Sequence, residues 1–331
     1  MWKGFAAGLL AAAVATGAFA QDFRPAVVYD LGGKFDKSFN EGVYNGVKRF
    51  ADETGIEVME FEVTNAAQRE QAISRMAQRG ASVVLGVGFA QADAIDKVAQ
   101  EFPDTKFAII DVSWLDQPNL RQYAFKEHEG SYLVGVAAAK ASESGTVGFV
   151  GGMDIGLIRK FACGYTQGVK ATNADATVLQ NMTGTTPSAW NDPGKGGELT
   201  RSQIDRGADV VYHAAGGTGL GVIRTAADQG ILAIGVDSDQ HQVAPGSVLT
   251  SMLKRVDNAA YNTFMDAMND EFSSGVLILG LADEGVDYVA NEENADLMTD
   301  EIRAAVEAAK AAIIAGDIEV HNYETDQNCP V

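Results

Sequence analysis

Short apolar runs alternate with amphipathic stretches of helical period along most of this chain, and this alternation restricts the fold more than any other feature. In the first part the apolar runs predict strands at 26–29, 57–61, 83–87, 107–110 and 122–125. Between them, a period near 3.6 predicts helices at 41–54, 66–78 and 90–101. This is the spacing of βαβ units, in which helices cover both faces of a parallel sheet. The first part therefore predicts a doubly wound α/β lobe.

A second series of the same kind follows, which predicts two lobes of one architecture. Its predicted strands are 146–150, 177–182, 210–213 and 232–235, with helices at 130–142, 157–172, 194–206 and 219–229. Beyond it we expect a strand at 248–253, a helix at 256–272, a strand at 276–281 and a helix at 299–315.

The order of these last elements suggests how the lobes are joined. If helix 256–272 packs on the first lobe and helix 299–315 on the second, the chain crosses between lobes three times and forms a three-strand hinge. The expected lobes are then 21–126 plus 254–275, and 127–253 plus 276–331. This crossing pattern is inferred from order and analogy.

The N-terminus has the features of an export signal. Lys3 precedes an apolar run at 5–19 that ends in Ala18-Phe19-Ala20, a small-x-small cleavage site. We therefore expect residues 1–20 to be removed and the mature protein to be periplasmic. No Cys lies near the cleavage site, and no later stretch approaches the roughly 20 apolar residues of a membrane span. We expect neither a lipid anchor nor direct membrane insertion.

Charge and cysteine content limit the classes of partner. A net charge of −20 argues against a nucleic-acid groove, which needs clustered Lys and Arg. The two cysteines, Cys163 and Cys329, are expected to pair in an oxidising compartment. The alternative is that Cys163 is a small buried apolar residue and Cys329 a free thiol in the tail.

One short motif follows the first strand and its Gly32-Gly33 turn. Asp36-Lys37-Ser38-Phe39-Asn40 brings a carboxylate, an aromatic ring and an amide to the start of the next helix. The loop after a strand's carboxyl end lies over the crevice of an open α/β sheet, where such side chains can stack on a planar ring and bind its edge. The alternative is a helix cap, with Ser38 or Asn40 capping and Phe39 packing into the core.

Several motifs together resemble the basic membrane protein family of substrate-binding proteins, which includes the purine nucleoside receptors of ABC transporters. Besides the loop just described, the matching segments are Phe125-Lys126-Glu127 before Gly130-Ser131, Gly148-Phe149-Val150-Gly151-Gly152, Ile158-Arg159-Lys160-Phe161, Trp190-Asn191-Asp192-Pro193 with Gly196, Ala214-Ala215-Gly216-Gly217-Thr218-Gly219, and Gly235-Val236-Asp237-Ser238-Asp239-Gln240. Each motif is weak alone, but the ordered set spans the mature chain.

The resemblance implies a type I periplasmic binding protein, whose two Rossmann-like lobes close on a nucleoside and deliver it to a permease. It implies that Phe39 stacks on the base, with Asn40 and either Asp30 or Asp36 at the base edge. It also implies that Asp111 and Asp237 bind the ribose, with Lys254 nearby. We expect a monomer. Many relatives are lipoproteins, and this chain departs from them in lacking the lipid-accepting Cys.

The positions of the two aspartates agree with these roles. Asp111 follows the apolar run 107–110, and Asp237 comes two residues after Gly235, so both should lie at strand tips over one crevice. A sugar diol can donate two hydrogen bonds to a carboxylate. The alternative for each is a helix cap. Lys254 is as well explained by a hinge salt bridge as by a ribose contact.

Trp190 is the candidate for the second stacking face, because it lies in the turn before helix 194–206 of the second lobe. It could instead seal its own loop, in which case Phe89 or Tyr212 would take its place. Gly216 lies in a glycine-rich loop that has no Gly-Lys-Ser/Thr ending, so it predicts close backbone approach to a ligand rather than a phosphate site.

The sequence gives little support for an enzyme. The four histidines have no metal-ligand spacing, and no Gly-x-Ser-x-Gly motif is present. We therefore expect a nucleoside receptor that needs no cofactor or metal. The alternatives are a sugar or riboflavin receptor of the same fold, a ligand-sensing domain of a regulator, and a secreted nucleoside hydrolase.

Overall fold

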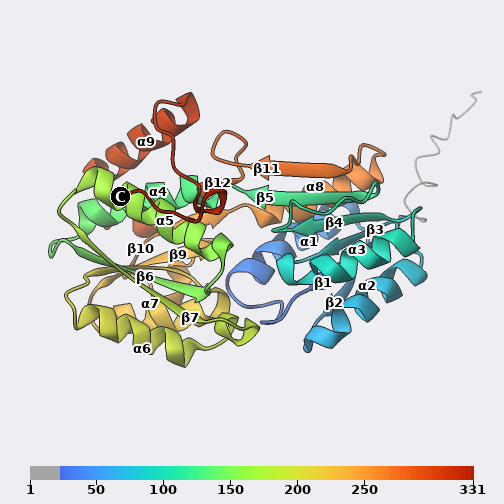
Figure 1. The fold of residues 1–331 in the computed structure, drawn as a ribbon, viewed down its shortest axis with the longest axis horizontal. Helices are drawn as coiled ribbons and strands as arrows, with labels where there is room; N and C mark the ends of the chain where they lie inside the picture. The colour runs from blue at the N-terminus through green and yellow to red at the C-terminus, as the bar shows by residue number, and fades with distance from the viewer. Residues whose placement is uncertain (1–22) are drawn as a thin grey trace, which may run out of the picture.

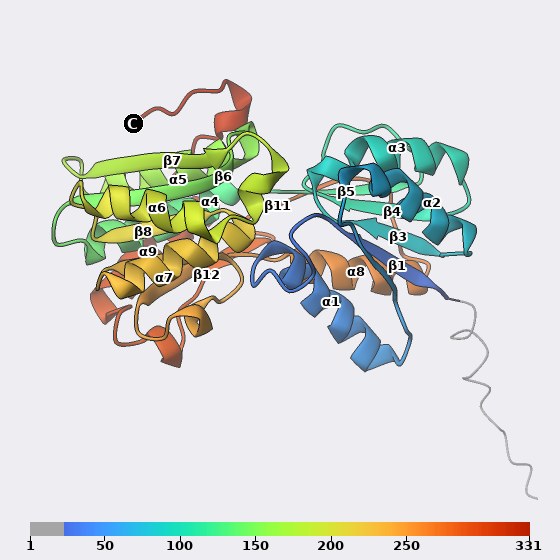
Figure 2. The same cartoon turned by 90° about the horizontal axis from the view of Figure 1, so that it is seen from below.

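The computed structural model describes residues 23–331, which form two α/β lobes side by side. Figure 1 shows the lobe that contains the first strands at the right and the other at the left, and Figure 2 shows the same separation from below. The predicted signal peptide, 1–20, lies outside the described residues.

The first lobe is a parallel six-stranded sheet with helices on both faces. Its strand order is β11-β5-β4-β3-β1-β2. The strands are β1 (Pro25–Tyr29), β2 (Met59–Glu62), β3 (Val83–Gly86), β4 (Lys106–Ile110), β5 (Leu120–Phe125) and β11 (Gly275–Leu279), and the helices are α1 (Phe39–Thr54), α2 (Arg69–Gln78), α3 (Ala92–Glu101) and α8 (Val256–Met268).

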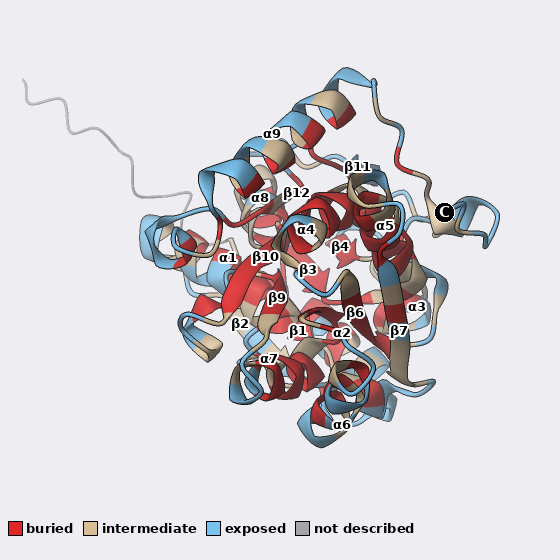
Figure 3. Cartoon of the chain, turned by 90° about the vertical axis from the view of Figure 1, so that its left-hand side faces the viewer, coloured by how far each residue is buried: buried red, intermediate tan, exposed pale blue. Residues whose placement is uncertain are grey.

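Successive residues of β1 point to opposite faces of this sheet, which explains its continuous apolar sequence. Val27 and Tyr29 belong to the apolar cluster that includes α1 and α8, whereas Ala26 and Val28 belong to the cluster under α2 and α3. A strand buried on both faces reads as an unbroken apolar run. Figure 3 shows the result, with buried strands inside and exposed surfaces on the outer helices.

The second lobe repeats this plan in the order β12-β10-β9-β8-β6-β7. Its strands are β6 (Thr146–Met153), β7 (Thr177–Gly184), β8 (Val210–Ala214), β9 (Leu232–Asp237), β10 (Val248–Lys254) and β12 (Val286–Tyr288), and its helices are α4 (Glu127–Ala141), α5 (Gly156–Thr172), α6 (Pro193–Ile204), α7 (Gly219–Asp228) and α9 (Asp300–Ala315). The two sheets differ at one edge, because β12 is antiparallel to β10 whereas β11 is parallel to β5.

The chain passes between the lobes at Lys126, at Arg255 and again within 280–285. The sequence-based boundaries at 275/276 and 253/254 need correction. The first cuts β11, which belongs to the first sheet, and the second separates Lys254 from β10, which belongs to the second sheet. An apolar edge strand has the same sequence pattern whichever sheet it joins. The first lobe therefore extends to Leu279, and the third crossing comes after it.

The C-terminal segment is fastened to α5. Cys163 and Cys329 form a disulfide, with their Cα atoms 5.6 Å apart. Near its other end, the segment exchanges two hydrogen bonds between the Gln167 side chain and the His321 backbone, at 2.8 and 3.0 Å. Within residues 23–331, no helix combines the length and apolarity needed to cross a membrane.

Candidate ligand-binding site

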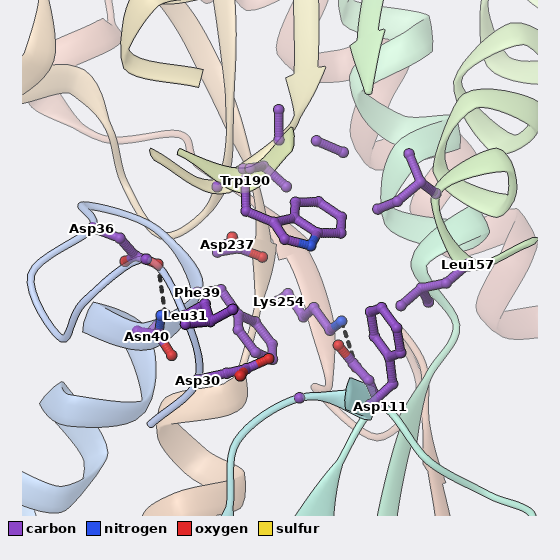
Figure 4. A pocket seen from close by; sticks show the side chains of 18 of the residues that line it. Asp30, Leu31, Asp36, Phe39, Asn40, Asp111, Leu157, Trp190, Asp237 and Lys254 are labelled. Carbon is purple, nitrogen blue, oxygen red and sulfur yellow. Dashed lines mark hydrogen bonds and ion pairs between the residues drawn. The ribbon is translucent and has the colours of Figure 1, made fainter. Parts of the chain in front are cut away.

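A pocket of about 710 Å³, part of it open to solvent, lies between the two lobes. All of the ligand-binding residues predicted from the sequence line it: Asp30, Asp36, Phe39, Asn40, Phe89, Asp111, Trp190, Gly216, Asp237 and Lys254. Residues distant in the sequence thus meet in one cavity (Figure 4).

The fold explains why these side chains meet. In the first sheet β1 and β3 are neighbours, and α1 and α3, the helices that follow them, lie on opposite faces. A crevice forms at the carboxyl ends of strands where the chain leaves in opposite directions. Phe39 and Phe89 enter the pocket from these two loops. The second lobe contributes Trp190 from the loop after β7 and Gly216 from the loop after β8, the strand that corresponds to β3.

Asp36 organises the loop that precedes α1. Its carboxylate accepts hydrogen bonds from the backbone N–H groups of Ser38 (2.9 Å), Asn40 (3.0 Å) and Glu41 (3.1 Å). The helix-cap alternative named Ser38 or Asn40 as the capping side chain. The Asp36 carboxylate instead accepts hydrogen bonds from the N–H groups at the start of α1. Burial raises the pKa of Asp36, although the three N–H groups oppose that shift. Asp30 is fixed separately by Arg69, at 2.8 and 3.0 Å.

Asn40 presents an unsatisfied acceptor within the pocket lining. The side chain is 3 % exposed, and its Oδ1 atom has no hydrogen-bond partner among the described residues. An unpaired buried acceptor costs about 1–3 kcal/mol. A donor on a ligand would remove that cost.

Trp190 faces the pocket from the second lobe, across from Phe39 (Figure 4). It ends the short 3-10 turn η3 (Pro187–Trp190), and its ring lies against Gly152, where an added Cβ would come within 2.1 Å of the ring. Trp190 thus packs against its own lobe and also lines the pocket. Tyr212, the proposed substitute, is wholly buried beside Ser131 and does not line the pocket.

Asp111 and Asp237 lie at corresponding places in the two lobes. Asp111 follows β4, the fourth strand of the first lobe, and Asp237 ends β9, the fourth strand of the second. Both have left-handed backbone conformations, with φ of 66° and 68°. Such conformations cost on the order of 1–3 kcal/mol outside glycine and are concentrated at functional sites.

Asp237 is bonded across the cleft. The Ser38 hydroxyl of the first lobe donates to its Oδ2 atom. Burial raises the pKa of Asp237 to about 7, partly offset by Lys254 and the Ser38 bond. A second bond between the lobes runs from Gln240 Nε2 to the Lys37 carbonyl, at 2.8 Å. Sequence reasoning gave neither Ser38 nor Gln240 this role.

Lys254 forms ion pairs, but with Asp111 and Glu127 rather than with both Asp111 and Asp237, as the salt-bridge alternative expected. Its ammonium lies 2.6 Å from Asp111 and 2.9 Å from Glu127. Burial alone would lower the pKa of Lys254, but these carboxylates outweigh it and raise the pKa. The same ammonium lies 5.2 Å from the ring centroid of Phe39, within the range of a cation–π interaction. Lys254 therefore joins the carboxylate at one wall to the aromatic ring at another.

Glu127 and Lys160 extend this network behind the pocket. Glu127 is wholly buried, and its Oε2 atom lies 2.7 Å from Lys160 Nζ. Burial would raise the pKa of Glu127, but Lys160 and Lys254 lower it to about 2. Both residues belong to motifs that resemble the family, but neither was predicted to have a role at the site. Their place in those motifs was the available signal.

The remaining wall is apolar, and sequence reasoning did not select its residues. They are Leu31, Leu157, Ile158, Phe161, Ala214, Ala215 and Val236. In the part of the chain that the structure describes, no group of three or more His, Cys, Asp or Glu side chains could hold a metal ion. The pocket therefore combines aromatic and aliphatic surfaces with a few buried polar groups, which suits a flat polar organic ligand.

Residues 23–324 match the model of a protein family described as ABC transporter substrate-binding protein PnrA-like, also called Bmp. The chain belongs to this family. The Bmp resemblance expected from the sequence is thereby confirmed. This Bmp protein is 31% identical to the "ABC transporter nucleoside-binding protein BmpA" of Lactococcus lactis, over 90% of this chain and 89% of that protein. This chain is therefore the substrate-binding protein of an ABC transporter.

A crystal structure of an ABC solute-binding protein from Aeropyrum pernix superposes with a TM-score of 0.81 at 28% identity, covering 91% of this chain and 93% of the other. The expected fold, two lobes of the solute-binding type, is confirmed.

A 34% identical relative in Pyrococcus furiosus, covering 86% of this chain and 74% of that protein, is named a lipoprotein. That comparison gives no support to the expected absence of a lipid anchor from this Bmp protein.

Proposed function

We propose that this Bmp protein captures a nucleoside, with purine nucleosides favoured, and delivers it to the permease of an ABC importer. One observation carries the proposal: two aromatic rings from opposite lobes and two buried strand-tip carboxylates line a single pocket with the unpaired oxygen of Asn40. A nucleoside offers a flat base, polar groups at its edge and a pentose diol. The aromatic rings suit the base, the Asn40 oxygen suits a donor at the base edge, and the two carboxylates suit the diol.

The base would lie between Phe39 and Trp190. Offset or edge contacts between aromatic rings add about 0.5–1.5 kcal/mol beyond the burial of their area. The Asn40 Oδ1 atom would accept a hydrogen bond from an N–H group on the base edge. Because both oxygens of Asp36 already accept backbone N–H groups, Asp36 would act mainly by holding the loop that presents Phe39 and Asn40.

The pentose would lie against Asp111 and Asp237. Its hydroxyls are donors, and hydrogen bonds to ionised acceptors are about twice as strong as neutral ones. Since Asp111 comes from the first lobe and Asp237 from the second, a sugar that engages both stabilises the closed arrangement. The ligand shifts the population toward closure by its differential affinity for that state.

The charges of the pocket favour nucleosides over nucleotides. Lys254 is the cation among the described lining residues, and its ammonium already faces Asp111 and Glu127. A phosphate placed near the sugar would meet the carboxylates of Asp111 and Asp237 without a free cation to compensate it. Desolvating an uncompensated anion is costly. We therefore expect the unphosphorylated ligand to bind.

Calorimetric titration of the mature protein tests this function. The ligands are inosine, guanosine, adenosine and uridine, with adenosine monophosphate, ribose and riboflavin as competitors. We expect micromolar or tighter binding of at least one purine nucleoside and at least about 100-fold weaker binding of the monophosphate. Riboflavin or ribose binding without nucleoside binding would favour the alternative receptors. Chromatography of the titrated nucleoside would reveal free base if the protein were a hydrolase.

A further inference from the structure

Charges of alternating sign connect the ligand pocket with the C-terminal segment. They begin with Asp111 at the pocket wall, which pairs with Lys254 at 2.6 Å. Lys254 pairs with Glu127 at 2.9 Å, and Glu127 with Lys160 at 2.7 Å. Lys160 in turn lies 2.7 Å from Glu324, in the 3-10 turn η7 (Tyr323–Thr325). The last carboxylate therefore comes from the tail of the chain.

This network lies on the hinge between the lobes. Glu127 comes directly after the crossing at Lys126, and Lys254 directly before the crossing at Arg255. Lys160 also donates a hydrogen bond to the Phe125 carbonyl at 3.1 Å, at the end of β5. A displacement of Lys160 would thus affect two of the three crossing segments.

The C-terminal segment holds Glu324 in place from both sides. On one side His321 is hydrogen-bonded to Gln167, and on the other Cys329 is joined to Cys163. Both attachments are to α5, the helix that also carries Lys160. Glu324 lines a second crevice beside the ligand pocket, and the two cavities share Phe89, Asp111 and Leu157.

Removal of the Glu324 charge would disturb the network. Lys160 is 4 % exposed, so it depends on carboxylate and carbonyl partners rather than on water. With Glu324 neutral, Glu127 becomes its remaining carboxylate partner among the described residues and is drawn toward Lys160. The ion pair between Lys254 and Glu127 is then weakened, and Lys254 shifts together with its other partner, Asp111.

We infer that Glu324 is a positioning residue for the ligand pocket. Through Lys160 and Glu127 it keeps Lys254 and Asp111 in place. The Cys163–Cys329 disulfide keeps Glu324 within ion-pair distance of Lys160. This inference rests on the proposed function, because its readout is nucleoside affinity. It assigns a binding role to a segment distant from the pocket in sequence.

The test compares the isosteric Glu324→Gln variant with Glu324→Asp, which keeps the charge. Titration with inosine and guanosine should show about three- to tenfold weaker binding for Glu324→Gln, as expected when a distant residue is coupled to a site. Glu324→Asp should restore affinity to within about twofold. The ligand-free melting temperature should fall only slightly, because Lys160 keeps Glu127 and the Phe125 carbonyl as partners. Glu319→Gln, which neutralises another exposed carboxylate of the tail, is the matched control.

A second arm replaces Cys163 and Cys329 together by Ser and measures affinity below the melting temperature of that variant. Affinity should fall as in Glu324→Gln, and Glu324→Gln should then add less than about a twofold loss, because the tail no longer presents the carboxylate. An undiminished extra loss would overturn the role of the disulfide. Normal nucleoside affinity in Glu324→Gln would overturn the inference alone. Failure of the wild type to bind any nucleoside would overturn the proposed function as well.

Discussion

Asp237 is a pocket residue whose charge changes near neutral pH. Burial raises its pKa to about 7, so both protonation states are populated under physiological conditions. Hydroxyl donors on a sugar stabilise the ionised form, so its pKa should be lower in the complex than in the free protein. Ligand binding and proton release at Asp237 are therefore linked.

Nucleoside affinity should consequently rise with pH up to about 7 and then level off. Below the midpoint the ligand must displace one proton, so the dissociation constant should increase by up to about tenfold per pH unit. Calorimetry between pH 5.5 and 8 in buffers of different ionisation enthalpy measures this directly. His128 and His213 do not account for it, because burial lowers both pKa values to about 4.

Asp237→Asn provides the control, because an amide does not titrate in this range. It should bind more weakly at pH 8 and show a flat profile. A profile in the variant that matches the wild type would mean that another group controls binding.

In the proposed function, Phe39 has the most direct contact with the base. Phe39→Ala should weaken nucleoside binding by roughly 2 kcal/mol or more, the range of an aromatic hot spot. The ligand-free melting temperature should change little, because Phe39 is only partly buried. Phe35→Ala in the same loop is the matched control, since Phe35 is 62% exposed and does not line the pocket. Equal losses in both variants would argue against stacking on Phe39.

At the residue scale, sequence reasoning predicted the aromatic and polar residues that line the pocket, but neither its apolar wall nor the hydrogen bonds between its residues. Phe39 and Asp237 could be found because each lies beside a predicted strand tip. Ser38 was named only in the helix-cap alternative, because its acceptor, Asp237, lies 199 residues away. Local patterns contain no information about such a partner.

At the scale of elements, apolar periodicity predicted most helices and strands to within a few residues. It missed β12, because three residues, Val286–Tyr288, are too few to show a period. It also placed β11 in the wrong lobe, because the pattern of a strand does not identify the sheet that it joins. The position of η3 beside β6 likewise depends on a contact that the sequence does not reveal, between Trp190 and Gly152.

Gly152→Val should displace Trp190 from its present position. A Cβ at residue 152 would come within 2.1 Å of the indole ring, so the ring must move. We expect weaker nucleoside binding and a shifted tryptophan emission spectrum, with a loss of stability of about 1–3 kcal/mol from overpacking. Titration and fluorescence measure these effects.

Gly184→Ala is the matched control for this prediction. It adds a Cβ nearby, at an ordinary contact distance of 3.6 Å from Ala189. The alanine variant should bind normally. Normal binding by Gly152→Val despite a moved ring would exclude Trp190 as a stacking face.

At the scale of the whole molecule, hydrogen bonds join the two lobes across the cleft, so ligand binding should affect the stability of both lobes. Ser38 bonds to Asp237, and Gln240 to Lys37, across the cleft. A ligand that contacts both lobes therefore stabilises both. Ligand-linked stabilisation amounts to about 2.7 kcal/mol at 100 times the dissociation constant.

Scanning calorimetry of the mature protein should accordingly show one unfolding transition that moves upward as a whole when the nucleoside is added. The physical reason is that each lobe loses its ligand contacts when the other unfolds. Two transitions, of which one is insensitive to the ligand, would show that the nucleoside contacts a single lobe.

Neither lobe is a continuous stretch of chain, and this affects the order in which the protein can mature. The first sheet needs β11, and the helical layer that contains α1 needs α8. Both follow the larger part of the second lobe in the chain. A ribosome has made more than four fifths of the polypeptide before the first lobe can be completed. A prematurely terminated product would therefore contain two unfinished sheets rather than one finished lobe, which makes it a ready substrate for proteases.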